Sequence, residues 1–293
     1  MTLLSPRAAL ALTIRLRKYS RMLVSAKLAP TFDYAALEEF WRAADELGFH
    51  AIWDYDHFYG LADSTTPTLE GWTTLAAMAT VSHQARVGCM VTSVTYRHPA
   101  MLAKMAITVD HICGGRLDFG IGAGWHEPEH RAYGIEFPNP GSRVAMLDEA
   151  LTVIRRLWTE ESVSFAGRFF TLDDARCEPK AVQRPHPPIV IGGSKPKMLR
   201  VTARHANEWN WTASPEEWLE ASTRLDEACD EIGRDPREIR RSVQLFLHPD
   251  QPGQIDVQID LLPEYEKLGC QHVVLSFYQP PSIELLARCA NLG

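Results

Sequence analysis

The sequence lacks several features that define common protein classes. Its six cysteines include no C-x-x-C pair, so neither a cysteine zinc site nor a disulfide framework is predicted. It has no block of lysine and arginine and its net charge is -7, which argues against nucleic acid as a partner. It has no apolar run long enough to span a bilayer. We therefore expect a soluble protein of the cytoplasm that binds neither nucleic acid nor a membrane.

Residues 1–21 also lack the signature of a secretory signal, because their apolar run is followed, rather than preceded, by basic residues. They contain no acidic residue, and in this they faintly resemble a transit peptide. We expect an unstructured N-terminal extension, or a start codon assigned too far upstream. The folded domain is expected to cover residues 22–293.

Short apolar segments rich in β-branched residues alternate with longer segments of helical periodicity from residue 22 onward. This alternation is typical of parallel strands that are joined by helices. Strands are predicted over residues 22–28, 51–55, 85–90, 117–121, 189–191, 208–210, 242–247 and 272–276. Helices are predicted over residues 34–47, 69–81, 99–112, 143–159, 195–205, 215–232, 256–268 and 283–290.

Eight strand–helix units in succession predict a single α/β domain with the (β/α)8 fold, the TIM barrel. A doubly wound sheet uses similar units, but it would have to hold all of these strands in one open sheet. Residues 58–68 and 125–142 are insertions that follow strands, so we expect them at the carboxyl end of the barrel, where the active sites of this fold lie. Apolar and polar residues alternate within residues 163–188, which predicts a small hairpin before the fifth strand.

The second predicted strand ends in "DYDHF", which places Asp54, Asp56 and His57 at the carboxyl rim. A histidine there can donate a proton or a hydrogen bond to a bound molecule, with Asp56 fixing its tautomer. We therefore predict His57 as the catalytic residue. The structural alternative is that Asp56 braces a loop and that His57 is a solvated surface residue.

The third and fourth predicted strands run into segments that suit a flat ligand. "CMVTSVTYRHP" continues with β-branched and hydroxyl residues beyond the expected end of the strand, which indicates a bulge, although such residues are also ordinary strand residues. "LDFGIGAGW" has glycines that let a ligand approach the backbone. Trp125 stands where the dinucleotide fingerprint requires its third glycine, so a Rossmann site is not predicted.

The segment "HEPEH" matches the zinc-protease motif H-E-x-x-H, which needs both histidines on one face of a helix. Pro128 disfavours a helix through this segment unless the helix begins at about Glu127, and the flanking residues offer no apolar helix. We therefore predict no metal site, and we expect His126 and His130 to be loop or surface residues.

The fifth predicted strand runs into "IVIGGSKPK", in which Gly192, Gly193 and Ser194 precede a helix that begins at Lys195. Backbone amides at a helix N-terminus, together with lysines, favour an anion such as a phosphate. The alternative is an ordinary glycine turn in which Ser194 caps the helix and the lysines are solvated. We favour the anion site because TIM barrels often bind anions at rim helices.

Several long segments together resemble the luciferase-like monooxygenase superfamily. They are "GFHAIWDYDHF", "PTLEGWTTLAAMAT", "TYRHPAMLAKMAITVDHICGGRLDFGIGAGWHEPEHRAYGIEFP", "RVAMLDEALTVIRRLW" and "VQRPHPPIVIGG". The chain is most similar to the branch that uses the deazaflavin coenzyme F420. The resemblance implies a TIM barrel, often dimeric, that transfers a hydride between F420 and a small organic substrate. The alternatives are an FMN-dependent monooxygenase served by a separate reductase, and a binding protein without turnover.

The resemblance also implies which residues contact the cofactor. Members of the family have an Asp-His pair at the barrel rim and a bulge after the third strand, frequently with a non-prolyl cis peptide, that backs the ring. A segment after the fourth strand lies beside the ring and the ribityl chain, and a glycine loop receives the phosphate-bearing tail. The residues at matching positions are Asp56, His57, Met90, Val91, Thr92, Ala123, Gly124, Trp125, Gly192, Gly193, Ser194 and Lys195. The segment 125–142 is the expected lid.

The chain departs from the family pattern at a few positions. Trp125 stands where the sugar-phosphate dehydrogenases have a glutamate that donates a proton, and Val94 stands where an asparagine is common. The lysine that grips the sugar phosphate has no obvious counterpart in "WNWTASPEEW". Glucose-6-phosphate is therefore not the expected substrate.

Overall fold

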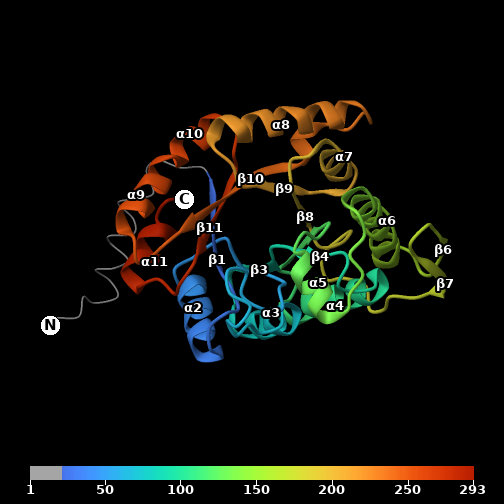
Figure 1. Ribbon diagram of the computed structural model, residues 1–293, viewed down its shortest axis with the longest axis horizontal. Coiled ribbons are helices and arrows are strands. Elements are labelled where there is room, and N and C mark those ends of the chain that lie inside the picture. The colour runs from blue at the N-terminus through green and yellow to red at the C-terminus, as the bar shows by residue number, and fades with distance from the viewer. Residues whose placement is uncertain (1–21) are drawn as a thin grey trace.

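The computed structural model describes residues 22–293, and the expected N-terminal extension lies outside the described residues. Eight parallel strands follow one another in the order β3-β2-β1-β11-β10-β9-β8-β5, and β3 also pairs with β5, which closes the barrel (Figure 1). The predicted TIM barrel is confirmed. The barrel strands are β1 (Leu23–Leu28), β2 (Ala51–Asp54), β3 (Arg86–Cys89), β5 (Leu117–Gly122), β8 (Ile189–Gly192), β9 (Glu208–Trp211), β10 (Arg240–Leu247) and β11 (His272–Phe277).

Helices surround the barrel strands on the outside (Figure 1). They are α2 (Tyr34–Glu46), α3 (Gly71–Val81), α4 (Pro99–Ile112), α6 (Pro140–Thr159), α7 (Pro196–His205), α8 (Pro215–Asp230), α9 (Pro252–Asp260), α10 (Leu262–Lys267) and α11 (Ile283–Ala290), with a 3₁₀ turn, η1 (Pro236–Glu238), after α8. The single helix predicted over residues 256–268 is in fact two, α9 and α10. Pro263 explains the break, because it has no N–H for the hydrogen bond that a continuous helix needs.

Two apolar clusters divide the interior. The smaller contains alternate residues of the barrel strands, including Ala51 and Trp53, and lies inside the barrel. The larger joins the outward faces of the strands, such as Ile52, to the helices. This alternation within "AIWD" follows from the two-residue period of a strand, and Ala51, Ile52 and Trp53 are all apolar because both faces of β2 are buried.

The insertions contain further elements. A short helix, α5 (Glu127–Tyr133), lies within residues 125–142, so the condition that a helix begin at about Glu127 is met. The predicted hairpin is confirmed as two antiparallel strands, β6 (Val163–Ala166) and β7 (Thr171–Ala175), which project beside α6 (Figure 1). A two-residue strand, β4 (Thr92–Ser93), pairs with the end of β5. None of the helices within residues 22–293 has the length and apolar character needed to cross a membrane.

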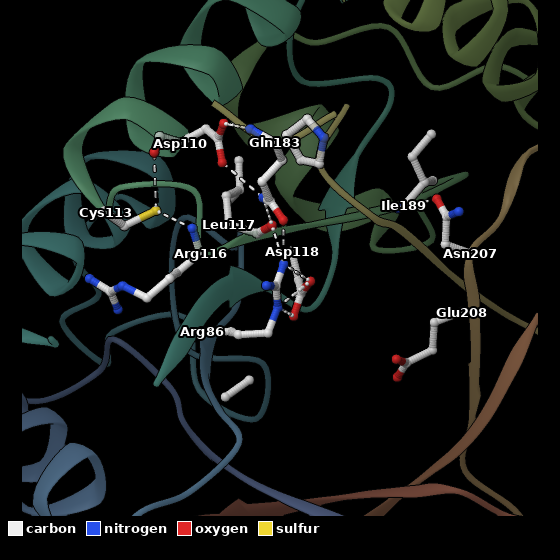
Figure 2. A network of polar contacts seen from close by, with 12 residues as sticks. Arg86, Asp110, Cys113, Arg116, Leu117, Asp118, Gln183, Ile189, Asn207 and Glu208 are labelled. Carbon is white, nitrogen blue, oxygen red and sulfur yellow. Dashed lines mark hydrogen bonds and ion pairs between the residues drawn. The ribbon is translucent and has the colours of Figure 1, made fainter. Parts of the chain in front are cut away.

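Polar residues close the amino ends of the strands (Figure 2). Arg86 donates to both oxygens of Asp118 at 2.9 Å and to Gln183 at 2.9 Å. Gln183 in turn donates to Asp110 at 2.8 Å. Because a buried charge without a partner is costly, this interlocked arrangement allows charged groups to lie at the base of the barrel.

Candidate active site

A cavity of about 710 Å³ opens at the carboxyl end of the barrel. Its volume lies in the range of sites for small molecules and cofactors. Predicted site residues that line it are Asp56, His57, Met90, Val91, Thr92, Gly124 and Trp125. Ala123 and the segment from Gly192 to Lys195 do not line this cavity.

The segment that follows β3 forms one wall of the cavity. The Met90–Val91 peptide bond is cis, as the resemblance implied. Lys27 donates a hydrogen bond of 2.8 Å from its Nζ to the Met90 carbonyl oxygen. Burial lowers the pKa of Lys27 to about 8, although the neighbouring acidic groups Cys89 and Asp54 act in the opposite direction. The Lys27 ammonium, which also lines the cavity, therefore holds the Met90 carbonyl in place and loses its proton more readily than an ordinary lysine.

Gly124 forms the edge of the cavity beside Ser93 and Thr95. Its φ of +77° is one that side-chain-bearing residues rarely adopt, and a Cβ there would lie 2.3 Å from Ser93 Oγ. The next residue, Trp125, is 64% exposed and lines the cavity. Glycine at 124 is thus required by the fold of this edge as well as by any ligand that approaches it.

Asp56 braces the loop rather than orienting His57. Its carboxylate accepts hydrogen bonds from Arg97 Nη2 at 3.0 Å and from the Thr92 hydroxyl. Arg97 also pairs with Glu70, the N-cap of α3. The tautomer role that the sequence suggested for Asp56 is therefore not supported, and the structural alternative describes Asp56 better.

Glu129 is the carboxylate that contacts His57. The Nδ1 atom of His57 lies 2.8 Å from Glu129 Oε2, and the Tyr96 hydroxyl donates to the same oxygen at 2.5 Å. The backbone N–H of Phe58 donates to Oε1 at 2.6 Å. Burial by itself raises the pKa of Glu129, but the hydrogen bonds from His57, Tyr96 and Phe58 outweigh it and lower the pKa to about 2.

The role of Glu129 is not evident from the sequence, because "HEPEH" resembles a zinc motif in which this glutamate has no function. A usable signal was present: proline is favoured in the first turn of a helix, so Pro128 permits a helix that begins at Glu127. Such a helix projects Glu129 from its first turn toward the end of β2. The two insertions, residues 58–68 and α5, are joined by this carboxylate.

His130 is not a surface residue, which corrects the expectation from sequence. Its side chain is fully buried because α5 packs against the segment after β4. Nδ1 lies 2.9 Å from the His126 carbonyl oxygen, and Nε2 lies 2.6 Å from Thr95 Oγ1. Both ring nitrogens are occupied, so the metal-binding pair of the H-E-x-x-H motif is not formed by His126 and His130.

The glycine loop before α7 lies outside the cavity lining. Gly193 has a φ of +107°, and its carbonyl oxygen accepts a hydrogen bond of 2.8 Å from Trp209 Nε1. Lys195, not Ser194, is the N-cap of α7, and it makes no side-chain cap. No side chain therefore caps the backbone amides at the N-terminus of α7, and the anion site there stays a prediction.

The fold and the cavity define a TIM-barrel protein with a cofactor-sized site at the carboxyl end. Residues 19–255 match the model of the luciferase-like monooxygenase family, and the chain belongs to this family.

Curated relatives cover part of the chain. An uncharacterized protein of Mycobacterium tuberculosis is 33% identical over 57% of this chain and 58% of its own length. The phthiodiolone/phenolphthiodiolone dimycocerosates ketoreductase of the same species is 30% identical over 74% of this chain and 61% of its own. Its F420-dependent hydroxymycolic acid dehydrogenase is 28% identical over 70% and 56%. The chain therefore spans somewhat more than half of the length of these relatives.

Solved structures share the fold. An F420-dependent secondary alcohol dehydrogenase, in complex with an F420-acetone adduct, superposes with a TM-score of 0.81 at 18% identity, over 93% of this chain and 98% of that one. The coenzyme F420-dependent tetrahydromethanopterin reductase of Methanopyrus kandleri has a TM-score of 0.77 at 18% identity, over 93% and 97%. A monooxygenase of Streptomyces bottropensis has a TM-score of 0.72 at 23% identity, over 92% and 97%.

Proposed function

We propose that this chain is an F420-dependent oxidoreductase that moves a hydride between the coenzyme and a small organic substrate. The observation that carries the proposal is the cavity at the carboxyl end, where a half-buried histidine, paired with a buried carboxylate, adjoins a wall suited to a flat ring. The named relatives that are F420-dependent, a dehydrogenase among the curated proteins and two enzymes of the same fold, support it.

The residues present fit a flat cofactor ring. The wall offers the Met90–Val91 backbone, held by Lys27, and the edge at Gly124 leaves no side chain in the way. Met90, Val91, Gly124 and Trp125 would contact the ring. When bound, the coenzyme supplies a hydride donor or acceptor, and the protein supplies position and electrostatics.

His57 would handle the proton that accompanies the hydride. Glu129 is ionised near neutral pH and faces Nδ1 of His57, so it fixes a proton on that nitrogen. In the neutral ring Nε2 is then the nitrogen without a proton, and it accepts one from a substrate hydroxyl. In the reverse direction the doubly protonated ring donates to a substrate carbonyl oxygen.

The cavity disfavours an anionic substrate. Among the residues of the described chain that line it, Lys27 is the only lysine or arginine, and its ammonium is directed to the Met90 carbonyl. Asp56 and Asp63 also line the cavity. A neutral alcohol or ketone would not be repelled by these carboxylates.

A titration of the purified chain with reduced and oxidised F420 and with FMN tests the proposal. We expect saturable binding of F420, measured by its absorbance and fluorescence, and turnover with an alcohol or ketone without oxygen uptake. Tighter binding of FMN together with oxygen uptake would instead indicate the FMN-dependent monooxygenase. Binding of F420 without multiple turnovers across a substrate panel would indicate a binding protein.

A homodimer is a further part of the proposal, supported by the resemblance to a family that is often dimeric. Sedimentation equilibrium of the purified chain tests it, and a monomer at all concentrations would contradict it.

A further inference from the structure

Two imidazoles converge on one buried carboxylate oxygen beside the cavity. Nδ1 of His57 lies 2.8 Å from Glu129 Oε2, and Nδ1 of His126 lies 3.4 Å from the same atom. One ligand atom from each of the three residues lies within 4.8 Å of the other two. Nδ1 of His126 is buried and has no hydrogen-bond partner, which is an unusual state for a polar ring atom.

We propose that His57, His126 and Glu129 form a binding site for a divalent transition-metal ion such as Zn²⁺. Two histidine nitrogens and one carboxylate oxygen are a set that holds zinc with coordination positions left open. Bonds of about 2.1 Å in tetrahedral geometry place ligand atoms about 3.3 to 3.5 Å apart. The 3.4 Å between His126 and Glu129 meets this spacing, and the 2.8 Å between His57 and Glu129 needs only a small opening.

The surroundings of Glu129 support a ligand role. Its other oxygen, Oε1, is held by the backbone amides of Phe58 at 2.6 Å and Tyr59 at 3.4 Å, and Tyr96 donates to Oε2. Carboxylates that bind metals are held by such outer hydrogen bonds, which fix their orientation. Within residues 22–293 no lysine or arginine pairs with Glu129, so no fixed cation neutralises it.

The site differs from the one that the letters H-E-x-x-H suggest. The motif would use His126 and His130 as ligands and Glu127 as a general base. In the proposed site His126 is still a ligand, but the other two ligands are His57, just after β2, and Glu129. His57 lines the cavity, so an ion has a route of entry. The proposal replaces the expectation from sequence that no metal is bound.

Metal binding has a chemical consequence for His57. A metal bound to Nδ1 takes the place of the proton on that nitrogen, so binding releases a proton and weakens as the pH falls. The metal and the hydrogen bond between His57 and Glu129 are thus alternatives. Metal binding at this site does not require the cofactor, since the ligands are all side chains of this chain.

The test uses the whole purified chain, stripped with a chelator and without any cofactor. Calorimetric titration with Zn²⁺ should show one tight site, and Co²⁺ should give the visible absorption bands of a low-symmetry site with nitrogen ligands. His126→Ala should weaken this site at least tenfold and remove the Co²⁺ bands, and Glu129→Gln should do the same. His83→Ala, which removes an exposed histidine elsewhere, should leave the site unchanged.

Folding of each variant is checked by circular dichroism, and Zn²⁺ should raise the Tm of the parent chain but not that of His126→Ala. The absence of a tight site in the parent chain overturns the proposal. So does a site that is unchanged in both folded variants, because the ion would then lie elsewhere. Neither result bears on the proposed redox function, which is measured with F420 and substrate.

Discussion

The two ends of the barrel each hold a histidine–carboxylate pair, which is fully buried only at the amino end, and they use it differently. At the carboxyl end His57 and Glu129 lie 2.8 Å apart, and at the amino end His272 and Glu208 lie 2.7 Å apart. In both pairs burial raises the pKa of the glutamate, but the histidine, by charge and hydrogen bonding, and neighbouring donors together lower it to about 2. The same two residue types with the same spacing are therefore present at both ends.

The two pairs differ in their hydrogen-bond partners and in their exposure. The second ring nitrogen of His272 lies 2.7 Å from Ser25 Oγ, and Glu208 also pairs with Arg240 at 3.2 Å, so every polar atom of that pair is held by protein. The His57 side chain is 13% exposed and lines a cavity, and no hydrogen bond holds its Nε2 in the described structure. A histidine–carboxylate pair thus becomes a site when one nitrogen is left for a ligand. It remains a structural brace when both are used.

The largest expected effect is a loss of turnover on substitution of His57, at the carboxyl end of the barrel. His57→Ala should reduce turnover by about 10²- to 10⁴-fold, the usual contribution of a general acid or base, while F420 binding is retained. Steady-state kinetics and a binding titration measure the two quantities. Turnover equal to that of the parent chain would remove His57 from the mechanism.

Glu208→Gln tests the amino end. It leaves His272 and Arg240 without their anionic partner, so we expect the free energy of unfolding to fall by about 3 to 5 kcal/mol, as for other broken buried pairs. Urea unfolding followed by circular dichroism measures this change. F420 affinity of the folded fraction should stay the same, and a loss of affinity without loss of stability would reverse the assigned roles.

The matched change at the carboxyl end is Glu129→Gln. The amide oxygen of glutamine can still accept from Phe58, so the loss of unfolding free energy should be smaller, about 1 to 2 kcal/mol. Turnover should fall, because a neutral amide does not fix the proton on Nδ1 of His57. The pH profile of turnover should also shift, whereas a purely structural role for Glu129 would leave that profile unchanged.

The pH dependence of stability follows from both glutamates. Their pKa is about 2 in the folded chain and near 4.5 when unfolded, so the stability that they contribute is present above about pH 4.5 and is lost as the pH falls toward 2. Each glutamate contributes about 1.4 kcal/mol per pH unit between these pKa values, so we expect the two together to give a slope of about 2 to 3 kcal/mol per pH unit near pH 3, measured by urea unfolding. Glu208→Gln should make this slope shallower, and an equal slope in that variant would contradict the assignment.

The sequence predicted the barrel well because its signals are local. Alternation of short apolar runs and amphipathic helices marked all eight strands, with ends that differ from the structure by one or two residues. The end of β2 placed His57 at the rim, and the glycines after β5 indicated close approach to a ligand. Each of these inferences uses residues that are neighbours in the chain.

The partners of these residues could not be predicted in the same way. Glu129 and His57 are 72 positions apart, and Asp56 and Arg97 are 41 positions apart. No period or spacing in one sequence links such positions, and the nearest carboxylate in the chain, Asp56, was the wrong partner for His57. The break between α9 and α10 was missed for a different reason, since the apolar periodicity continues across it.

The sequence by itself therefore determined the order of strands and helices, the closed barrel that this order implies, and the end at which the cavity lies, because strand direction and connection are properties of the chain. The tertiary structure alone decided which carboxylate holds His57, that His130 is buried while His126 keeps an unpaired nitrogen, and which glutamate becomes a brace. The reason is physical. Hydrogen bonds and burial depend on distances of a few ångströms between segments that only the packing of the folded chain brings together.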